Sequence, residues 1–155
     1  MTNTAKEELI KRLFLEYDRF SCLTDTLFGV CLGDKWGVLS TEKGKLILPV
    51  EYDEISHFTG TLFKVCLGDK WGVFSTEKGK LILPVEYDEI YRFTGALFKV
   101  CIGDKWGVFS TEKGKLIVPV EYDEISYFTN TTLFKVCIGD KRGILDTSAG
   151  SVTWK

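Results

Sequence analysis

The 155-residue chain is poor in histidine and proline and has no long apolar run. Its only histidine is His57, and it contains no nucleophile motif, P-loop or dinucleotide-binding fingerprint, so we expect neither catalysis nor a cofactor. No run approaches the ~18 apolar residues of a membrane-spanning helix. Twenty Lys and Arg against 22 Asp and Glu give a net charge of −2. That balance provides no net attraction to nucleic acid or to an anionic membrane surface.

What the chain does have is an internal repeat. Three consecutive segments of 35 residues, 26–60, 61–95 and 96–130, are nearly identical. The second segment differs from the first at four positions, and the third differs from the second at six. The high count of 15 glycines follows from this repetition, because most of them stand at the same few positions of each copy.

The two ends of the chain carry parts of a further repeat. Residues 13–25 follow the second half of a unit, and residues 132–155 follow the first half. The sequence therefore predicts three whole repeats and one that is split between the termini. If the array curls into a ring or barrel, the two halves pair and remove exposed sheet edges. The alternative is an open array with capped ends.

Each repeat predicts an antiparallel β-meander. In the copy 61–95, the segments rich in β-forming residues are 62–67, 71–76, 81–85 and a short fourth segment, 87–93. Connections of two to four residues require antiparallel neighbours. Pro84 cannot donate to a sheet ladder and marks an edge or a bend, whereas Gly72 leaves room for a close backbone or ring. We therefore expect an all-β fold of four meander repeats.

A short helix is predicted before the repeats, over about residues 4–13. Thr4 and Glu7 match a capping box, and Leu9 and Leu13 fall on one helical face that covers an apolar end of the array. Charged residues interrupt this segment, which is therefore not a secretory signal peptide. We expect a cytoplasmic protein.

The motif Asp-Lys-Trp-Gly-Val occurs at 34–38, 69–73 and 104–108, each time followed by Glu-Lys-Gly-Lys and Pro-Val-Glu-Tyr-Asp. In these motifs the chain resembles the WG-repeat family, also called the KWG repeat, over residues 13–155. The resemblance implies a bacterial all-β repeat protein with an interaction role. It implies no common enzymatic activity, cofactor or catalytic residue. Arg142 stands where the motif has Trp, so the last unit departs from the pattern.

Two repeated sets of residues are potential metal ligands. Cysteine occupies one equivalent position in every copy, and a fifth cysteine, Cys22, lies elsewhere. Reduced thiols are the simpler interpretation, and the alternative is a zinc site formed by four thiolates in a four-fold ring, without the CxxC pairs that pre-organise such sites. Glu51, Asp53 and Glu54 also recur, and they either hold Ca²⁺ or satisfy backbone N–H groups at a turn. We expect no bound metal.

One pair of positions varies most between the copies. It reads Ser56-His57, Tyr91-Arg92 and Ser126-Tyr127, and Ser21-Cys22 in the first half-copy. Large and chemically diverse side chains at one site indicate a solvent-facing row, and Tyr and Arg are frequent hot-spot residues. The simpler alternative is unconstrained surface variation. The hypothesised partner-binding residues are His57, Tyr91, Arg92 and Tyr127.

The repeated aromatic residues offer a second hypothesis. A face that stacks on a sugar or another small ligand would use Trp36, Trp71, Trp106, Tyr52, Tyr87 and Tyr122. Their simpler interpretation is that they fill the core of each unit. We expect a non-catalytic binding or scaffold module that recognises an unidentified protein partner and is a monomer or a weak homo-oligomer, with carbohydrate or small-ligand binding as the alternative.

Overall fold

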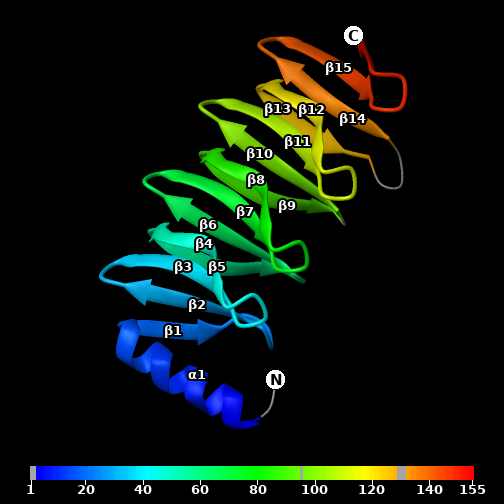
Figure 1. Cartoon of the computed structure of the whole chain (residues 1–155). Helices are drawn as coiled ribbons and strands as arrows, with labels where there is room; N and C mark the ends of the chain where they lie inside the picture. The colour runs from blue at the N-terminus through cyan, green and yellow to red at the C-terminus, as the bar shows by residue number, and fades with distance from the viewer. Residues whose placement is uncertain (1–2, 95, 129–131) are drawn as a thin grey trace. The chain divides into compact units, whose positions relative to one another are not determined.

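The structure is a computed structural model that describes residues 3–94, 96–128 and 132–155. Within these ranges the chain forms one helix and sixteen strands in four four-stranded sheets (Figure 1). The all-β fold of four meander repeats is therefore confirmed. The chain divides into two compact units, Met1–Val85 and Glu86–Lys155, which are described separately below.

The first unit contains the helix and two sheets, with strand orders β1-β2-β3-β4 and β5-β6-β7-β8. The last strand, β8, ends two residues beyond the unit. The elements are α1 (Asn3–Glu16), β1 (Arg19–Cys22), β2 (Leu27–Leu32), β3 (Lys35–Ser40), β4 (Lys45–Tyr52), β5 (Glu54–Thr59), β6 (Leu62–Leu67), β7 (Lys70–Ser75) and β8 (Lys80–Tyr87).

The second unit contains the other two sheets, in the orders β9-β10-β11-β12 and β13-β14-β15-β16. Their strands are β9 (Glu89–Thr94), β10 (Leu97–Ile102), β11 (Lys105–Ser110), β12 (Lys115–Tyr122), β13 (Glu124–Tyr127), β14 (Leu133–Ile138), β15 (Lys141–Asp146) and β16 (Ser151–Trp154). The expected repeat ends at Gly95 and Asn130, and the inserted Thr131, lie outside the described residues.

The sheets are offset from the sequence repeats by one strand. In the first copy, β2, β3 and β4 follow one another as a meander, but the fourth strand, β5, pairs with β6 of the next copy. The chain leaves the first sheet after Tyr52 and begins the second at Glu54. Each sheet therefore consists of the last strand of one copy and the first three strands of the next.

The sequence repeat that is split between the termini supplies strands to two different sheets. The N-terminal segment supplies β1, which pairs with β2, and the C-terminal segment supplies β14, whose two edges already pair with β13 and β15. Because every sheet begins with the last strand of the preceding copy, residues 13–25 complete the first sheet rather than the last. Each of the four described sheets is open, with two edge strands, so none closes into a barrel.

The Trp-Gly pair and the proline of each repeat form one structural feature. A Cβ atom added to Gly37 would lie 2.6 Å from the carbonyl oxygen of Leu48 and 2.8 Å from the carbonyl carbon of Pro49. The β3–β4 register shifts at this point, between Trp36 and Val38. Pro49 therefore lies in a bulged edge strand, as expected for a residue without an N–H donor. Gly107 makes the same approach, 2.6 Å from the carbonyl oxygen of Val118.

In each unit the hydrophobic core lies between two sheets. In the first unit, Val38 and Leu48 belong to the same buried cluster as Val65 and Phe74 of the second sheet. In the second unit, Val108 and Val118 pack with a set from the last sheet, namely Phe134, Val136 and Leu145. Within each unit, one face of each sheet packs against the other sheet, since successive side chains of a strand alternate between the two faces.

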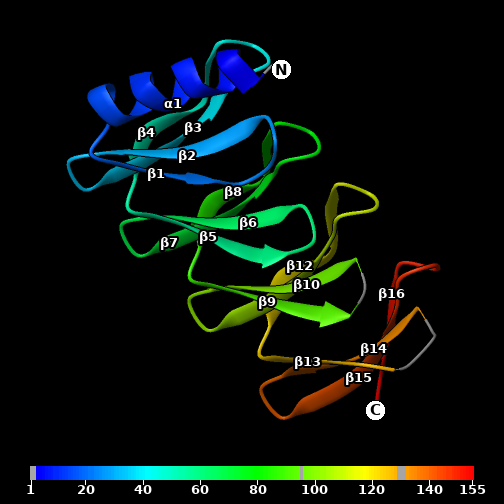
Figure 2. The same ribbon diagram turned by 90° about the horizontal axis from the view of Figure 1, so that it is seen from below.

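The helix covers the outer face of the first sheet, as expected. It is longer than predicted at both ends, and Thr4 lies inside it rather than at its N-cap. Leu13 is buried and forms a cluster with Phe28 and Val30 of β2. Figure 2 shows α1 lying across this sheet. The helix therefore shields apolar side chains that would otherwise face water.

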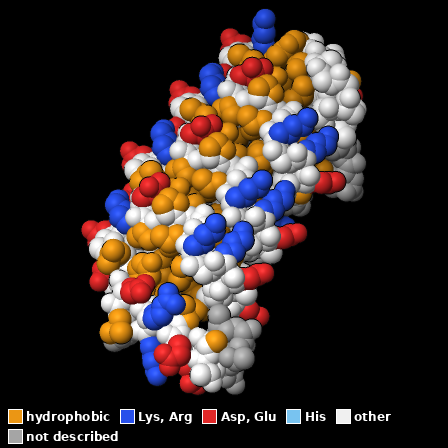
Figure 3. Space-filling model, in the orientation of Figure 1, with side chains coloured by type: hydrophobic (Ala, Val, Ile, Leu, Met, Phe, Trp, Pro, Cys, Tyr) orange, Lys and Arg blue, Asp and Glu red, His pale blue; other side chains and the backbone are white. Residues whose placement is uncertain are grey.

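An aspartate follows the helix, and another follows the last strand of each of the first three sheets. Its Oδ2 accepts a hydrogen bond from the backbone N–H of a glycine in the next hairpin turn, at 2.6–2.7 Å. The pairs are Asp18 with Gly33, Asp53 with Gly68, Asp88 with Gly103, and Asp123 with Gly139. This is the backbone-satisfying alternative expected for Asp53, but the N–H lies in the following sheet rather than in the local turn. Acidic and basic side chains gather at these hairpin tips in Figure 3.

Two of these aspartates also bind a lysine of the preceding sheet. Lys35 donates to Oδ1 of Asp53, and Lys105 donates to Oδ1 of Asp123. The Lys35 hydrogen bond, with that of the Gly68 N–H, lowers the pKa of Asp53. For Asp123, the Gly139 N–H has the larger effect in lowering the pKa, followed by Lys105. Each of these carboxylates therefore links two stacked sheets of its unit.

We predict that Gly107→Ala destabilises the protein by about 1–3 kcal/mol, because the new Cβ would overlap backbone atoms that cannot move aside independently. Urea unfolding followed by tryptophan fluorescence measures the loss. Gly29→Ala is the matched control, because its Cβ would meet only side chains, the nearest being Ser21 Oγ at 3.3 Å. Equal stability of the two variants would contradict the close-approach argument.

We predict that the double variant Asp53→Asn, Asp123→Asn has a lower Tm than the parent at pH 7. The folded pKa values of both carboxylates are lowered, so their contribution is complete above their unfolded pKa of about 4 and is lost as the pH falls through the folded values. The difference in Tm should therefore shrink below about pH 4. The control is Glu42→Gln, Glu112→Gln, two exposed turn residues. A difference that stays constant with pH would refute the assignment.

Candidate functional site

The variable positions lie on the first strand of each sheet, which is an edge strand. These strands are β1, β5, β9 and β13. His57 is exposed on β5, where its Nε2 lies 3.1 Å from the carbonyl oxygen of Gly60 and its ring packs edge-on against Phe63. The other three hypothesised residues, Tyr91, Arg92 and Tyr127, belong to the second unit.

Tyr91 is the most distinctive of these side chains. It is 51% exposed, yet its ring stacks on that of Trp106 with a centroid separation of 6.0 Å and an interplanar angle of 27°. Its hydroxyl donates a hydrogen bond of 3.2 Å to Oε1 of Glu89, and this hydrogen bond is the main cause of the raised pKa of Tyr91. The ring is therefore held in one orientation while half of it faces solvent.

A lysine lies against the same tryptophan. Lys99 Nζ is 4.6 Å from the centroid of the Trp106 ring and 5.8 Å from that of Phe93. The strand register explains the grouping, because Tyr91 stands opposite Lys99, and Cys101 stands opposite both Glu89 and Trp106. Tyr91, Lys99 and Trp106 thus form a compact aromatic and cationic group on one face, which we call the Tyr91 cluster.

Arg92 and Tyr127 lie outside this cluster, in different surroundings. Arg92 follows Tyr91 on β9 and points to the opposite face, where it stands opposite Phe98. Tyr127 is half-buried, since its ring contacts Phe93 at 5.7 Å and Phe134 at 5.3 Å between centroids. In the second unit, therefore, Tyr91 and Arg92 are exposed, whereas much of Tyr127 supports neighbouring aromatic rings.

The aromatic residues of the stacking hypothesis separate into two groups. The three tyrosines are 3–7% exposed and belong to the core, so the structure corrects their assignment to a ligand-stacking face. They lie opposite tryptophans, as in the pairs Trp36–Tyr52 and Trp106–Tyr122. Burial raises their pKa values, in Tyr52, Tyr87 and Tyr122.

The tryptophans are half-buried, and a cation lies over each ring. Lys64 Nζ lies 4.7 Å from the Trp71 centroid. In the first sheet Gly29 replaces the lysine, and Arg19 of β1 lies over Trp36 at 5.4 Å instead. Such contacts contribute about 0.5–1 kcal/mol at exposed sites. The sequence analysis missed them, although Lys64 and Trp71 recur together and both lie on predicted strands.

The repeated cysteines have a structural contact in common. Each thiol donates to the carbonyl oxygen of the glycine two residues ahead, at 3.1–3.3 Å, in Cys31, Cys66, Cys101 and Cys137. Burial, followed by nearby acidic groups, raises the pKa of Cys66 and of Cys101. None of the five cysteines, all of which are described, is in a disulfide. All four thiols therefore act as hydrogen-bond donors within the hairpin turns, and the raised pKa values of Cys66 and Cys101 favour their protonated form.

Two further observations concern metals and membranes. Within residues 3–94, 96–128 and 132–155, no three His, Cys, Asp or Glu side chains are grouped as a metal site requires. The helix formed by the described residues is too short and too polar to cross a membrane.

Comparison with known proteins agrees with this architecture of antiparallel four-stranded meanders, which defines an all-β repeat protein. The family model described as "WG containing repeat" matches residues 36–71, 71–106 and 106–141. These matches span more than half of the chain, which therefore belongs to the WG containing repeat family. No curated protein matches the chain.

Some solved structures are similar to the chain at low sequence identity. A eukaryotic initiation factor is 14% identical with a TM-score of 0.45, and the match covers 83% of this chain and 39% of that one. Kluyveromyces lactis Hsv2p is 12% identical with a TM-score of 0.41, covering 88% and 50%. The N-terminal domain of Nup159 is 8% identical with a TM-score of 0.38, covering 90% and 43%. The chain thus spans half or less of the length of each of these structures.

We predict that Cys22 reacts with a thiol reagent such as DTNB much faster than the buried cysteines. Cys22 is exposed, whereas Cys31, Cys66 and Cys101 are buried. In addition, the raised pKa values of Cys66 and Cys101 reduce their thiolate fractions. Absorbance of the released thiolate should show one fast equivalent that is absent from Cys22→Ser, and the buried thiols should react only on unfolding. A fast phase that survives in Cys22→Ser would contradict this.

Proposed function

We propose that the chain is a non-catalytic binding or scaffold module of the cytoplasm that captures a protein partner through the variable row. The observation that carries the proposal is the orientation of Tyr91, half-exposed but fixed by Trp106 and Glu89. A side chain that is already ordered loses little conformational entropy on binding. A rigid tyrosine and an exposed arginine on the same edge strand are both residue types that are frequent in binding hot spots.

The position of the row on edge strands supports recognition of a protein. An edge strand such as β9 presents backbone groups as well as side chains, and a partner chain can use both. Phe93 and Tyr127 extend the aromatic surface on the side of Tyr91. His57 occupies the position equivalent to Arg92 in the first unit and is a candidate contact of that unit.

Several observations favour binding over catalysis. His57 is engaged by Gly60 and Phe63, and the buried thiols are donors in turns rather than nucleophiles. Thiols used as hydrogen-bond donors are also suited to a reducing compartment such as the cytoplasm. Ligand stacking is less favoured than protein binding, because the tyrosines are buried and cations already lie over the tryptophan rings.

We predict that the triple variant Tyr91→Ala, Arg92→Ala, Tyr127→Ala loses partner capture by at least about tenfold, because truncation of central hot-spot residues removes most of the binding free energy. The measurement is quantitative pull-down from the native host followed by titration with the purified partner. Circular dichroism and thermal unfolding establish that the variant remains folded.

The control carries three substitutions on the opposite edge of the same sheet. Lys113, Lys115 and Leu116 are exposed on β12 and its turn, and their replacement by Ala should leave capture unchanged. His57→Ala, measured separately, should weaken capture if the row extends to the first unit. Undiminished capture by the folded triple variant would overturn the proposal.

A further inference from the structure

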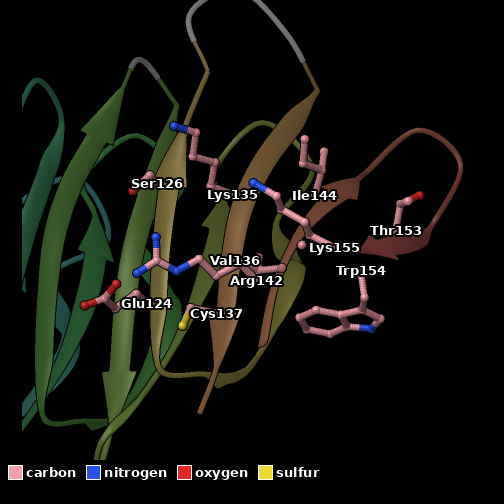
Figure 4. A pocket seen from close by; sticks show the side chains of 11 residues that line it. Glu124, Ser126, Lys135, Val136, Cys137, Arg142, Ile144, Thr153, Trp154 and Lys155 are labelled. Atoms are coloured by element: carbon pink, nitrogen blue, oxygen red, sulfur yellow. The ribbon is translucent and has the colours of Figure 1, made fainter. Parts of the chain in front are cut away.

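The last sheet has a hollow on the face that the other layer of its unit does not cover. The hollow has a volume of about 660 Å³ and is formed by strands β13 to β16 (Figure 4). Its volume lies within the range of about 300–1,000 Å³ that is usual for small-molecule sites. The opposite face of this sheet, with Phe134 and Val136, packs in the core of the unit.

The strand register places the lining residues on one face in two rows. In the first row Ser126 stands opposite Lys135, which stands opposite Ile144, which in turn stands opposite Thr153. In the second row Glu124 stands opposite Cys137, and Cys137 stands opposite Arg142. The backbone N–H of Lys155 donates to the carbonyl oxygen of Arg142 at 2.8 Å and thereby extends this second row.

Comparison with the preceding sheet of the same unit shows how the hollow arises. There the corresponding rows begin with Tyr91 and Lys99 and include the opposed pair Trp106 and Tyr122. In the last sheet Ser126 stands in place of Tyr91, and Arg142 stands in place of Trp106. Two aromatic side chains are therefore removed and one positive charge is introduced at matched positions, and Lys155 adds a second cation beside Arg142.

The exchange also changes exposure. Val108 of the preceding sheet is 0% exposed, whereas Ile144 at the same register position is 41% exposed. A polar face favours solubility where no other layer of the unit covers the sheet. Solubility alone, however, does not require cations in particular, and in a chain of net charge −2 three of them line one hollow with a single carboxylate, Glu124.

We propose that this hollow binds a small phosphate monoester that carries an apolar group. The hollow contains many N–H donors, on Arg142, Lys135 and Lys155, and the hydroxyl of Ser126. These donors outnumber the hydrogen bonds that the two oxygens of a carboxylate can accept. A phosphate monoester offers three acceptor oxygens and a charge of about −1.5 to −2 at pH 7. Ile144, which is 41% exposed, provides apolar surface for the rest of the ligand.

Parts of this site are ordered without ligand. Lys135 Nζ lies 5.3 Å from the centroid of the Phe128 ring, which holds the lysine over the sheet. The main chain at Lys155 is fixed by Arg142, and the thiol of Cys137 is occupied by the carbonyl oxygen of Gly139. Such prior ordering lowers the entropic cost of binding.

The test uses the full chain and phenyl phosphate, with binding followed by ¹H–¹⁵N NMR of the Trp154 indole and backbone signals of β13 to β16. We expect saturable shifts that weaken with added salt. Arg142→Gln should weaken binding at least about tenfold, because it removes a charged hydrogen-bond donor. Arg142→Trp, which restores the residue of the other repeats, should abolish binding while preserving the fold.

The control variant is Lys113→Gln, which changes the net charge equally but lies in an exposed turn of the preceding sheet. It should bind phenyl phosphate as the parent does. The proposal is overturned if shifts do not saturate below about 10 mM, if Arg142→Gln binds equally well, or if benzoate binds more tightly than phenyl phosphate. None of these outcomes depends on Tyr91 or Arg92, so the site is tested independently of partner capture.

Discussion

The structure depends on a single carboxylate placed between successive sheets. In the first unit one residue, Asp53, separates the end of β4 from the start of β5, so it must reverse the chain and also set the next layer. Its two oxygens bind Lys35 of one sheet and the Gly68 N–H of the other. The next strand, β5, begins directly after Asp53 and forms one edge of the second sheet. The variable residues Ser56 and His57 lie on this edge strand.

Much of the local structure follows from the sequence, whereas the assignment of strands to sheets does not. The alternation of β-forming residues and the glycine turns predict β6, β7 and β8 closely. In a tandem array, however, the fourth strand of each copy lies between two meanders along the chain, that of its own copy and that of the next. Local sequence does not distinguish between these two partners. The choice depends on a non-local contact, the hydrogen bond that the aspartate accepts from the next hairpin, so local sequence alone does not assign residues 13–25 to the first sheet.

The candidate site was predictable to a similar degree. Variation between copies correctly indicated exposure of His57, Tyr91 and Arg92, but it could not show that Phe93 and Phe134 bury half of Tyr127. The burial of Tyr52 depends on the bulge near Pro49. From Ser40–Lys45 to Trp36–Tyr52 the register shifts first by one residue and then by two, and a one-residue shift changes which side chains share a face. Residue type alone could not reveal that the tyrosine lies inside.

The departures from the repeat are chemically related to one another. In the sheet β9-β10-β11-β12, Tyr91 packs with Trp106 and Lys99, which are types that recur in the repeats. The result is an exposed aromatic group that is held in one orientation. At the equivalent positions the last sheet keeps the lysine but replaces both aromatic residues, by Ser126 and Arg142. The lysine therefore has two roles: it packs against an indole in one sheet and joins other cations in the next. The same sheet fold therefore accommodates either set of side chains at these positions, and it presents a flat aromatic surface with one set and a cationic hollow with the other.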